Sequence, residues 1–370
     1  MHVMMTVNAA WNIWNFRRPL IIQLLADGHQ VTVAAPRDDS VAELKALGCT
    51  FIPFDMKPAG LNPLDGIGLA IRYRRLFRTQ RPDIILSYTI KSNIFGAMAA
   101  RISRIPFLPN VTGLGTAFLA GGLVQSIAER LYRVAFRNLP IIFFQNVDDR
   151  ALFLARGLVA EGQGRLLPGS GINLARFSDD HYPEADDGIV FLMIARLLKD
   201  KGVIEFVEAA RMVGARHRDV RFQLLGAVGS DNRTAIGRET VSAWVAEGVV
   251  EYLGTTADVR PCIARAHCIV LPSYREGAPR TLIEAAAMSR PLIATDVPGC
   301  RAVVDHGELG LLCPARDVAG LAAAFATFMA LPHEARRAMG KAGRAKMVAE
   351  FDEAVVVSAY QEAIAELTAS

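Results

Sequence analysis

The sequence predicts an α/β protein built from two consecutive domains with parallel sheets. Its 370 residues exceed what one hydrophobic core usually holds, and 52% of them are apolar, so two large cores can form. In both halves, short apolar runs of strand length alternate with amphipathic segments of helix length. Strands separated by helices of this length are typical of βαβ units, and two successive sets of them predict two Rossmann-like domains.

The first half supplies five of the predicted strands. They lie at residues 1–7, 30–36, 50–54, 83–88 and 106–112. Helices are expected at residues 19–29, ending at Gly28, at 41–49 and from about 93 to 102. A basic amphipathic segment at residues 69–81 lies between the third and fourth strands.

The second half repeats this rhythm. Strands are expected at residues 188–195, 220–226, 249–254, 268–273, 291–295 and 309–313, with helices at 203–215 and 234–248 and a final amphipathic helix at 351–367. A stretch rich in Gly and Pro at residues 166–177 marks the boundary, so the domains are expected at 1–170 and 171–351. Function in this layout belongs to the cleft between the domains, beside the carboxyl ends of the strands.

Cysteine, histidine and aspartate patterns give no sign of a metal or a disulfide framework. The five cysteines show no CxxC spacing and no signal peptide precedes the first strand, so we expect a reduced, cytoplasmic protein. The seven histidines are dispersed and no Asp-x-Asp occurs. We therefore expect no metal cofactor.

Charge divides unevenly along the chain. Residues 1–170 carry 19 Lys/Arg against 11 Asp/Glu, whereas residues 171–370 carry 22 against 26. The excess predicts an anionic partner for the first half, either a membrane surface or a nucleic acid, with scattered solvated charge as the alternative.

Two segments of the first half have the composition of interfacial helices. Residues 69–81 mix Leu69, Ile71, Leu76 and Phe77 with five arginines. In residues 113–137, Phe118, Leu119, Leu123 and Val124 precede a helix that carries Arg130, Arg133 and Arg137. The uncharged span at 105–128 contains prolines and glycines, which favours a peripheral membrane contact over a transmembrane helix. A solvated surface helix is the alternative for residues 69–81.

The stretch CIVLPSYREGAPRTLIE at residues 268–284 carries the strongest chemical signal. A strand is followed by a polar turn, and Pro279 suits the first turn of the next helix. The free amides of that helix start can bind phosphate. Glu276 then lies in the loop before the helix and Glu284 lies one to two turns inside it, so the length of a ligand separates the two carboxylates.

A second signal is FLMIARLLKDKGVIEF at residues 191–206. Arg196 and Lys201 occupy the loop between a strand and a helix, where a guanidinium and an ammonium suit a diphosphate. Solvated side chains are the alternative for these two residues.

Together, ARLLKDKG, EGAPRTLIE with its Glu-x7-Glu pattern, and GELGLLCPARD resemble the retaining glycosyltransferases of family 4, which have the GT-B fold. The resemblance implies that the last helix, at residues 352–370, crosses back to the first domain. It also implies that Arg196 and Lys201 bind the donor diphosphate, that Glu276 and the backbone after it hold the sugar, and that Glu284 binds the ribose. The expected donor-binding residues are Arg196, Lys201, Gly226, Glu276, Gly277, Ala278, Pro279, Thr281, Leu282 and Glu284, with Glu276, Arg196 and Lys201 as the catalytic ones and a base pocket near residues 226–230. Fixed cations and a helix start can stabilise a nucleoside diphosphate leaving group without a metal ion.

The first half departs from that family in two places. Asn8 to Phe16 are expected to replace its glycine-rich turn after the first strand, and Thr112 stands where many members carry a histidine. TIKSNIFG at residues 89–96 and IPFLPNVTGLGTAF at 105–118 resemble the enzymes that add N-acetylgalactosamine to an undecaprenyl-diphosphate-linked sugar. The resemblance implies acceptor-side roles for Asn8, Trp11, Arg17, Lys91, Asn93 and Thr112, with Lys91 and the arginines near the lipid diphosphate. Thr112 and Asn110 could instead only cap strand ends.

These patterns lead to one hypothesis with three rivals. The chain is expected to transfer a hexose or N-acetylhexosamine, best guessed as N-acetylgalactosamine, from a UDP-sugar to an undecaprenyl-diphosphate-linked saccharide for surface polysaccharide or glycoprotein glycans. Retention and metal independence come from the family resemblance, and the expected location is the inner face of the cytoplasmic membrane, on anionic lipid. The rivals are a family 4 enzyme with a soluble acceptor, a GT-B UDP-sugar epimerase and, weakest, a nucleic-acid binder, for which the sequence offers no aromatic stacking platform.

Overall fold

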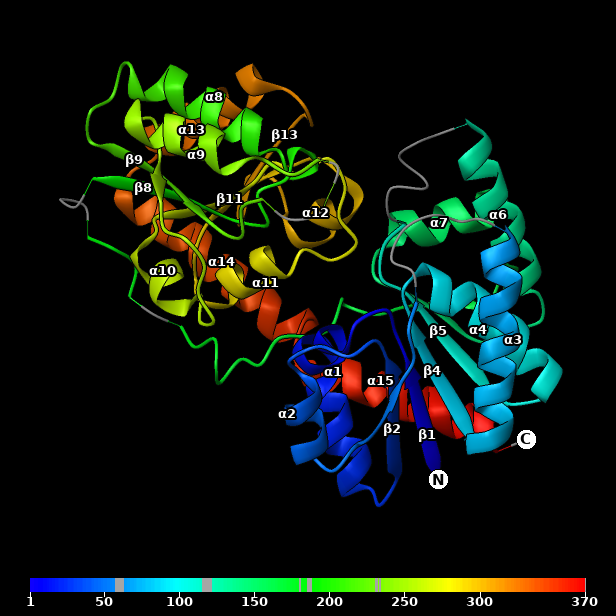
Figure 1. The fold of residues 1–370 in the computed structure, drawn as a ribbon. Coiled ribbons are helices and arrows are strands. Elements are labelled where there is room, and N and C mark those ends of the chain that lie inside the picture. The colour runs from blue at the N-terminus through cyan, green and yellow to red at the C-terminus, as the bar shows by residue number, and fades with distance from the viewer. Residues whose placement is uncertain are drawn as a thin grey trace. The chain divides into compact units, whose positions relative to one another are not determined.

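A computed structural model describes residues 1–56, 63–114, 122–179, 181–184, 188–229, 232 and 234–369. The chain divides into two compact units, unit 1 with Met1–Gly171 and Glu353–Ser370, and unit 2 with Ile172–Asp352. Each unit contains one parallel sheet with helices on both of its faces, which confirms the predicted α/β fold with two Rossmann-like sheets (Figure 1). The last helix of the chain belongs to unit 1, as predicted.

Unit 1 is built on a seven-stranded sheet with the order β3-β2-β1-β4-β5-β6-β7. Its strands are β1 (His2–Thr6), β2 (Gln30–Ala35), β3 (Thr50–Pro53), β4 (Ile84–Tyr88), β5 (Phe107–Val111), β6 (Ile142–Phe144) and β7 (Gly164–Leu166). Its helices are α1 (Ala10–Ala26), α2 (Val41–Ala46), α3 (Pro63–Gln80), α4 (Ile90–Ser103), α6 (Gly122–Phe136), α7 (Val147–Ala155) and α15 (Glu353–Thr368).

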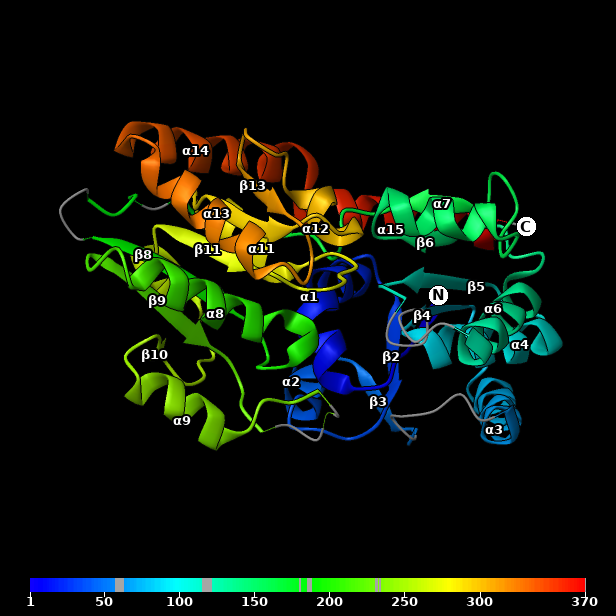
Figure 2. The same cartoon turned by 90° about the horizontal axis from the view of Figure 1, so that it is seen from above.

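Two hydrophobic clusters cover the faces of this sheet. The helices α1, α2 and α15 pack on one face, and α3, α4 and α6 pack on the other (Figures 1 and 2). The C-terminal helix is bound to the sheet by Tyr360, whose hydroxyl accepts a hydrogen bond from Asn110 Nδ2 at 2.9 Å and whose ring packs against Phe143. Residues 353–368 therefore complete the core of unit 1.

Unit 2 is built on a six-stranded sheet with the order β10-β9-β8-β11-β12-β13. Its strands are β8 (Ile189–Ile194), β9 (Val220–Leu225), β10 (Glu251–Tyr252), β11 (Cys268–Leu271), β12 (Leu292–Thr295) and β13 (Gly310–Cys313). Its helices are α8 (Val203–Gly214), α9 (Arg238–Ala246), α10 (Arg260–Arg265), α11 (Arg280–Ala287), α12 (Pro298–Val303), α13 (Val318–Ala330) and α14 (His333–Glu350), with a 3₁₀ turn η2 (Lys199–Lys201).

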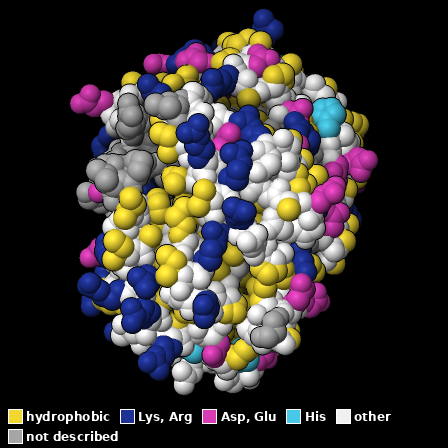
Figure 3. Space-filling model, turned by 90° about the vertical axis from the view of Figure 1, so that its right-hand side faces the viewer, with side chains coloured by type: hydrophobic (Ala, Val, Ile, Leu, Met, Phe, Trp, Pro, Cys, Tyr) yellow, Lys and Arg dark blue, Asp and Glu magenta, His cyan; other side chains and the backbone are white. Residues whose placement is uncertain are grey.

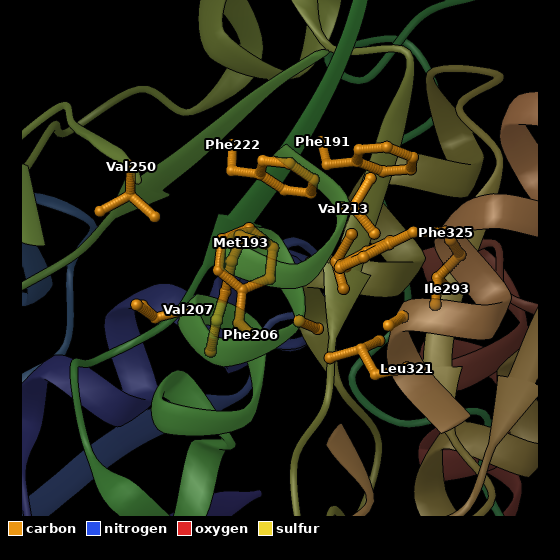
Figure 4. Close-up of a cluster of buried hydrophobic side chains, with 14 of the residues drawn as sticks. Phe191, Met193, Phe206, Val207, Val213, Phe222, Val250, Ile293, Leu321 and Phe325 are labelled. Carbon is orange, nitrogen blue, oxygen red and sulfur yellow. The ribbon is translucent and has the colours of Figure 1, made fainter. Parts of the chain in front are cut away.

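Aromatic side chains fill the core on one face of the unit 2 sheet, between the strands and α8 and α13. Phe191 and Phe222 stack with ring centroids 5.4 Å apart, and Phe325 lies 4.6 Å from the Phe191 ring (Figure 4). Phe206 of α8 meets Phe222 edge to face at 5.9 Å. The other face is covered by α10, α11, α12 and α14, so α11, which carries the candidate site, has its inner side fixed in a second core.

The chain connects the two units twice, at residues 171–172 and at residues 352–353. Inside each unit, the ends of these two connections contact each other. In unit 2, Ile172 N–H donates to Phe351 O at 2.8 Å. In unit 1, Gly171 has a φ of +73°, and a Cβ there would lie 2.5 Å from Glu353 Cα, so only glycine fits beside the start of α15.

Two sequence-predicted boundaries were wrong. Residues Asn8 to Phe16 do not form a turn and the first helix does not begin at 19, because α1 begins at Ala10 and includes Pro19. Its buried positions, Ala10, Ile13, Arg17, Leu20, Ile21 and Leu24, follow helical spacing straight through the proline. The helix expected to begin near 93 starts at Ile90, directly after β4. Pro279 lies at the start of α11, as predicted, where it is the N-cap.

The predicted interfacial segments coincide with α3 and α6. Phe118 and Leu119 lie outside the described residues, as do Ser230 and the side chain of Leu123. Within the described part of the chain, no single helix is both long and apolar enough to cross a membrane, and only α13 with α14, bent by 112° at their junction, pass that test as a pair.

Candidate functional site

The candidate donor site lies where the strand order of unit 2 reverses. β8 pairs with β9 on one side and with β11 on the other, so the loops that follow β8 and β11 leave the same edge of the sheet in opposite directions. Ligands of doubly wound sheets bind at this edge, outside the carboxyl ends of the strands. Arg196 and Lys201 follow β8, and Glu276 and Glu284 follow β11, so the fold brings the two sequence motifs together.

Close backbone contacts hold the loop after β8. Gly226 has a φ of +152°, and a Cβ there would lie 1.8 Å from Ala195 O. Gly202, with a φ of +75°, would place a Cβ 2.0 Å from Pro272 O. Both positions therefore require glycine, which lets the loops after β8, β9 and β11 approach one another. The sequence placed Gly226 in the donor site but gave Gly202 no role.

The loop after β8 carries two cationic side chains, and their environments differ. Arg196 is exposed, and no described residue forms an ion pair with it. Lys201 lies at the end of η2, and its Nζ is 2.5 Å from Glu276 Oε1. The side chains of Lys201 and Glu276 keep only 25% and 12% of their exposure, so this ion pair is partly shielded from water. Lys201 and Glu276, predicted from separate motifs, are thus direct neighbours.

Glu284 lies on the first turns of α11 with its carboxylate buried. Arg280 Nε donates to Glu284 Oε1 at 2.6 Å, one helical turn away. Burial raises the pKa of Glu284, and the charge and hydrogen bond of Arg280 act in the opposite direction. Thr281 Oγ1 donates to Ile194 O at 3.0 Å, which ties the start of α11 to the end of β8. Arg280 is therefore the partner of Glu284, a pairing that its i, i+4 spacing could have indicated.

The backbone after Glu276 is in close contact with α12. A Cβ on Gly299 would lie 2.6 Å from both Glu276 O and Gly277 O, so a larger residue would displace the loop that carries Glu276. Ala278 packs against the neighbouring core, Pro279 caps α11, and Leu282 is fully buried beneath it. Gly299 stands outside the sequence motifs and was missed, because its role depends on a contact between distant segments.

The predicted acceptor-side residues gather at the corresponding edge of unit 1. Asn8, Trp11 and Arg17 follow β1, Lys91 and Asn93 lie on the first turn of α4 after β4, and Thr112 follows β5. Trp11 is 53% exposed, and its backbone N–H donates to Asp38 Oδ2 at 2.7 Å. Asn93 is buried and donates through Nδ2 to Asn110 O at 2.8 Å. Their roles toward an acceptor stay predictions.

Metal ligation has no candidate in the described residues. No group of three or more His, Cys, Asp or Glu side chains there is arranged to hold a metal ion.

Family models match most of both units. Residues 188–330 match the model described as glycosyl transferases group 1, and residues 2–146 match glycosyl transferase 4-like. The protein is a family 4 glycosyltransferase with the GT-B fold. The sequence resemblance on which the donor residues were chosen is therefore confirmed at the level of the family.

Named relatives and solved structures are consistent with this glycosyltransferase family. The chain is 28% identical, over 95% of each chain, to the Campylobacter jejuni N,N'-diacetylbacillosaminyl-diphospho-undecaprenol alpha-1,3-N-acetylgalactosaminyltransferase. It is 22% identical, over 76% of each chain, to the Staphylococcus aureus capsular polysaccharide biosynthesis glycosyltransferase CapM. Anabaena HepE in complex with UDP superimposes with a TM-score of 0.80 at 17% identity, covering 99% of this chain and 100% of HepE. A Thermosynechococcus elongatus sucrose-phosphate synthase does so with a TM-score of 0.80 at 23% identity over all of both chains.

The Arg280 and Glu284 pair leads to a prediction about stability and pH. Because Arg280 opposes the upward shift that burial gives the pKa of Glu284, Arg280→Met should raise that pKa further. A carboxyl whose folded pKa lies above its unfolded value, near 4.5, favours folding less as pH rises from the unfolded pKa through the folded one. Arg280→Met should therefore lower the melting temperature more at pH 8 than at pH 5.

Differential scanning fluorimetry of the full chain at the two pH values measures this. As a control, Arg280→Met in a Glu284→Gln background should lower the melting temperature by the same amount at both pH values. An equal loss at pH 5 and pH 8 in the Glu284 protein would show that Arg280 does not control the ionisation of Glu284.

Proposed function

We propose that this glycosyltransferase transfers a hexose or N-acetylhexosamine, with N-acetylgalactosamine as the first candidate, from a UDP-sugar to an undecaprenyl-diphosphate-linked saccharide, with retention of configuration. The observation that carries the proposal is the relationship with the Campylobacter jejuni enzyme, which extends over 95% of each chain. The name of that enzyme specifies both an undecaprenol diphosphate acceptor and an N-acetylgalactosamine group. The resemblance of residues 89–96 and 105–118 to the same group of enzymes is independent of the donor motifs.

Unit 2 supplies the donor site in this proposal. The UDP complexes of HepE make UDP the expected nucleotide. The partnership of Lys201 and Glu276 has a consequence for binding, since each neutralises the other in the structure. We infer that the donor exchanges this ion pair for two new contacts, in which Lys201 meets a phosphate oxygen and Glu276 accepts hydrogen bonds from sugar hydroxyls. Arg196, exposed and without an ion-pair partner in the described residues, is available for the same diphosphate.

The transfer itself requires a stabilised leaving group and a route for one proton. As the bond between the sugar C1 and the β-phosphate oxygen breaks, negative charge grows on UDP, and Arg196, Lys201 and the free amides at the start of α11 stabilise it. The acceptor hydroxyl attacks C1 from the face that UDP leaves, and its proton passes to the departing phosphate oxygen. The products are UDP and the extended saccharide. In this scheme the protein's own cations do the work that a metal ion does in other transferases.

The acceptor's lipid chain places the reaction at a membrane, which we infer to be the inner face of the cytoplasmic membrane. On α3, Ile67 and Ile71 are 59% and 57% exposed, and Arg74, Arg75 and Arg78 continue the same side of the helix with exposed side chains. The side of the molecule on which α3 and α6 lie in Figure 1 faces the viewer in Figure 3, where Lys and Arg side chains lie among apolar ones. Exposed isoleucines beside arginines suit an interface with anionic lipid.

Activity is tested with radiolabelled UDP-sugars and an undecaprenyl-diphosphate-linked saccharide. The wild type should elongate the acceptor, and Glu276→Gln should lower kcat by about 10²-fold or more, as expected for loss of a group that acts on the transition state. UDP alone should still bind to the variant, because Glu276 is assigned to the sugar. Glu239→Gln, at an exposed glutamate of α9 in the same unit, is the control and should retain activity.

No elongation with any common UDP-hexose or UDP-N-acetylhexosamine would contradict the proposal. Release of an altered UDP-sugar without acceptor would indicate an epimerase instead.

Membrane binding is tested by flotation with vesicles that contain anionic lipid. Because each basic residue near such a surface contributes about 1 kcal/mol, changing Arg74, Arg75 and Arg78 together to Gln should lower the vesicle partition coefficient by about two orders of magnitude. The control changes three exposed arginines of unit 2, Arg216, Arg218 and Arg221, to Gln and should float as the wild type does. A wild type that fails to float would favour a soluble acceptor.

A further inference from the structure

Tyr274 lies in the loop after β11, shortly before Glu276, and is bonded twice to the segment that follows β8. Its backbone N–H donates to Asp200 O at 3.0 Å, and its hydroxyl donates to Glu205 Oε1 at 2.6 Å. In the sequence, Asp200 and Glu205 lie on either side of Lys201, the residue that forms the ion pair with Glu276. Tyr274 therefore joins the two loops of the candidate donor site at residues that flank this ion pair.

The carboxylate that accepts the Tyr274 hydroxyl is buried. Glu205 is 9% exposed and lies on the first turn of α8, where a helix start favours negative charge. Among the described residues, Tyr274 donates the hydrogen bond that reaches Oε1 of this carboxylate, and Oε2 is buried without a partner. Loss of the hydroxyl would leave a buried charge without a donor, which is unfavourable. The hydrogen bond therefore holds Tyr274 firmly against α8.

The Tyr274 hydroxyl stays protonated at neutral pH. Burial, together with the hydrogen bond to Glu205 and the negative charge of that carboxylate, raises the pKa of Tyr274 to about 12. The phenol is therefore a hydrogen-bond donor under the conditions of an activity assay.

A third loop covers the ring of Tyr274. Arg316 is exposed in the turn after β13, and its Cζ lies 4.6 Å from the centroid of the Tyr274 ring. A guanidinium over an aromatic face makes a favourable cation–π contact. The sequence placed Arg316 in the segment GELGLLCPARD but gave it no role. The segments after β8, β11 and β13 thus meet at one tyrosine.

We propose that Tyr274 is a positioning residue for sugar transfer, because its bonds to Asp200 and Glu205 hold the loop of Glu276 beside the loop of Lys201. These bonds involve neither member of the ion pair, so they persist when a nucleotide-sugar separates Lys201 from Glu276. The contacts belong to unit 2 alone, and their importance for transfer rests on the proposed function.

Tyr274→Phe tests this role, since it removes the hydroxyl and keeps the ring beneath Arg316. With the UDP-sugar and the lipid-linked acceptor, the variant should lower kcat by about tenfold or more, as expected when a reacting group is misplaced. Its calorimetric affinity for UDP should stay unchanged, because UDP lacks the sugar to which Glu276 is assigned. Tyr182→Phe is the control and should keep the wild-type kcat, although it also removes a hydroxyl of unit 2, one that donates to His267 O at 2.9 Å.

A double-mutant comparison separates positioning from a general loss of stability. If Tyr274 acts through Glu276, Tyr274→Phe should lower kcat in the wild type and have little further effect in a Glu276→Gln background. Equal factors in the two backgrounds would overturn the proposal. Glu205→Gln keeps an oxygen that can accept the hydroxyl, so it should retain more activity than Glu205→Leu. Equal activity of these two variants would also contradict it.

Hydrogen–deuterium exchange tests the same contacts without turnover. In the free protein, Tyr274→Phe should speed exchange in residues 274–279 by about tenfold, and Tyr182→Phe should leave it unchanged. Arg316→Met, a change at an exposed position, is a second variant and should speed exchange there to a smaller extent. Unchanged exchange in Tyr274→Phe would overturn the role of Tyr274. If the wild type elongates no acceptor, the proposed function fails, but the exchange measurement still decides whether Tyr274 holds the loop of Glu276.

Discussion

The parallel pairing of β8 with β11 is the constraint on which the candidate donor site depends. It places the loops that carry Lys201 and Glu276 at one edge of the sheet, although 75 residues separate them in the chain. Glycine makes the approach close enough, since a side chain at Gly202 would collide with Pro272 O and one at Gly299 would collide with the backbone of Glu276. Two large hydrophobic cores on the two faces of the unit 2 sheet fix the strands and helices at this edge. The packing of these cores therefore positions the charged residues, whatever contacts the charged groups make with one another.

The two carboxylates of the candidate donor site are paired with cations, whereas Arg17 in unit 1 is not paired with a carboxylate of the described residues. Lys201 pairs with Glu276 and Arg280 pairs with Glu284, so each donor-site carboxylate already has a cation. Arg17 has none among the described residues. Paired groups can exchange partners when a nucleotide-sugar enters.

Sequence reasoning succeeded where periodicity and short motifs carry the information. The alternation of apolar runs and helices was sufficient for two parallel sheets, and the spacing of Arg196, Lys201, Glu276 and Glu284 was sufficient for the family. It failed at α1, which was expected at residues 19–29 but begins at Ala10 and continues through Pro19. Contacts between segments that are far apart in the sequence could not be predicted from short motifs. Gly299 affects Glu276 only because α12 packs against the loop that carries Glu276. Arginine is usually exposed, but the fold buries Arg17.

In this scheme the nucleotide of the donor binds at the β8 and β11 edge of unit 2. Hydrogen–deuterium exchange of the full chain with and without UDP measures it most directly, peptide by peptide. The account predicts that UDP slows exchange in residues 196–203 and 274–284 of unit 2 and leaves residues 89–96 of unit 1 unchanged. Protection confined to unit 1, or none in residues 274–284 at saturating UDP, would contradict it.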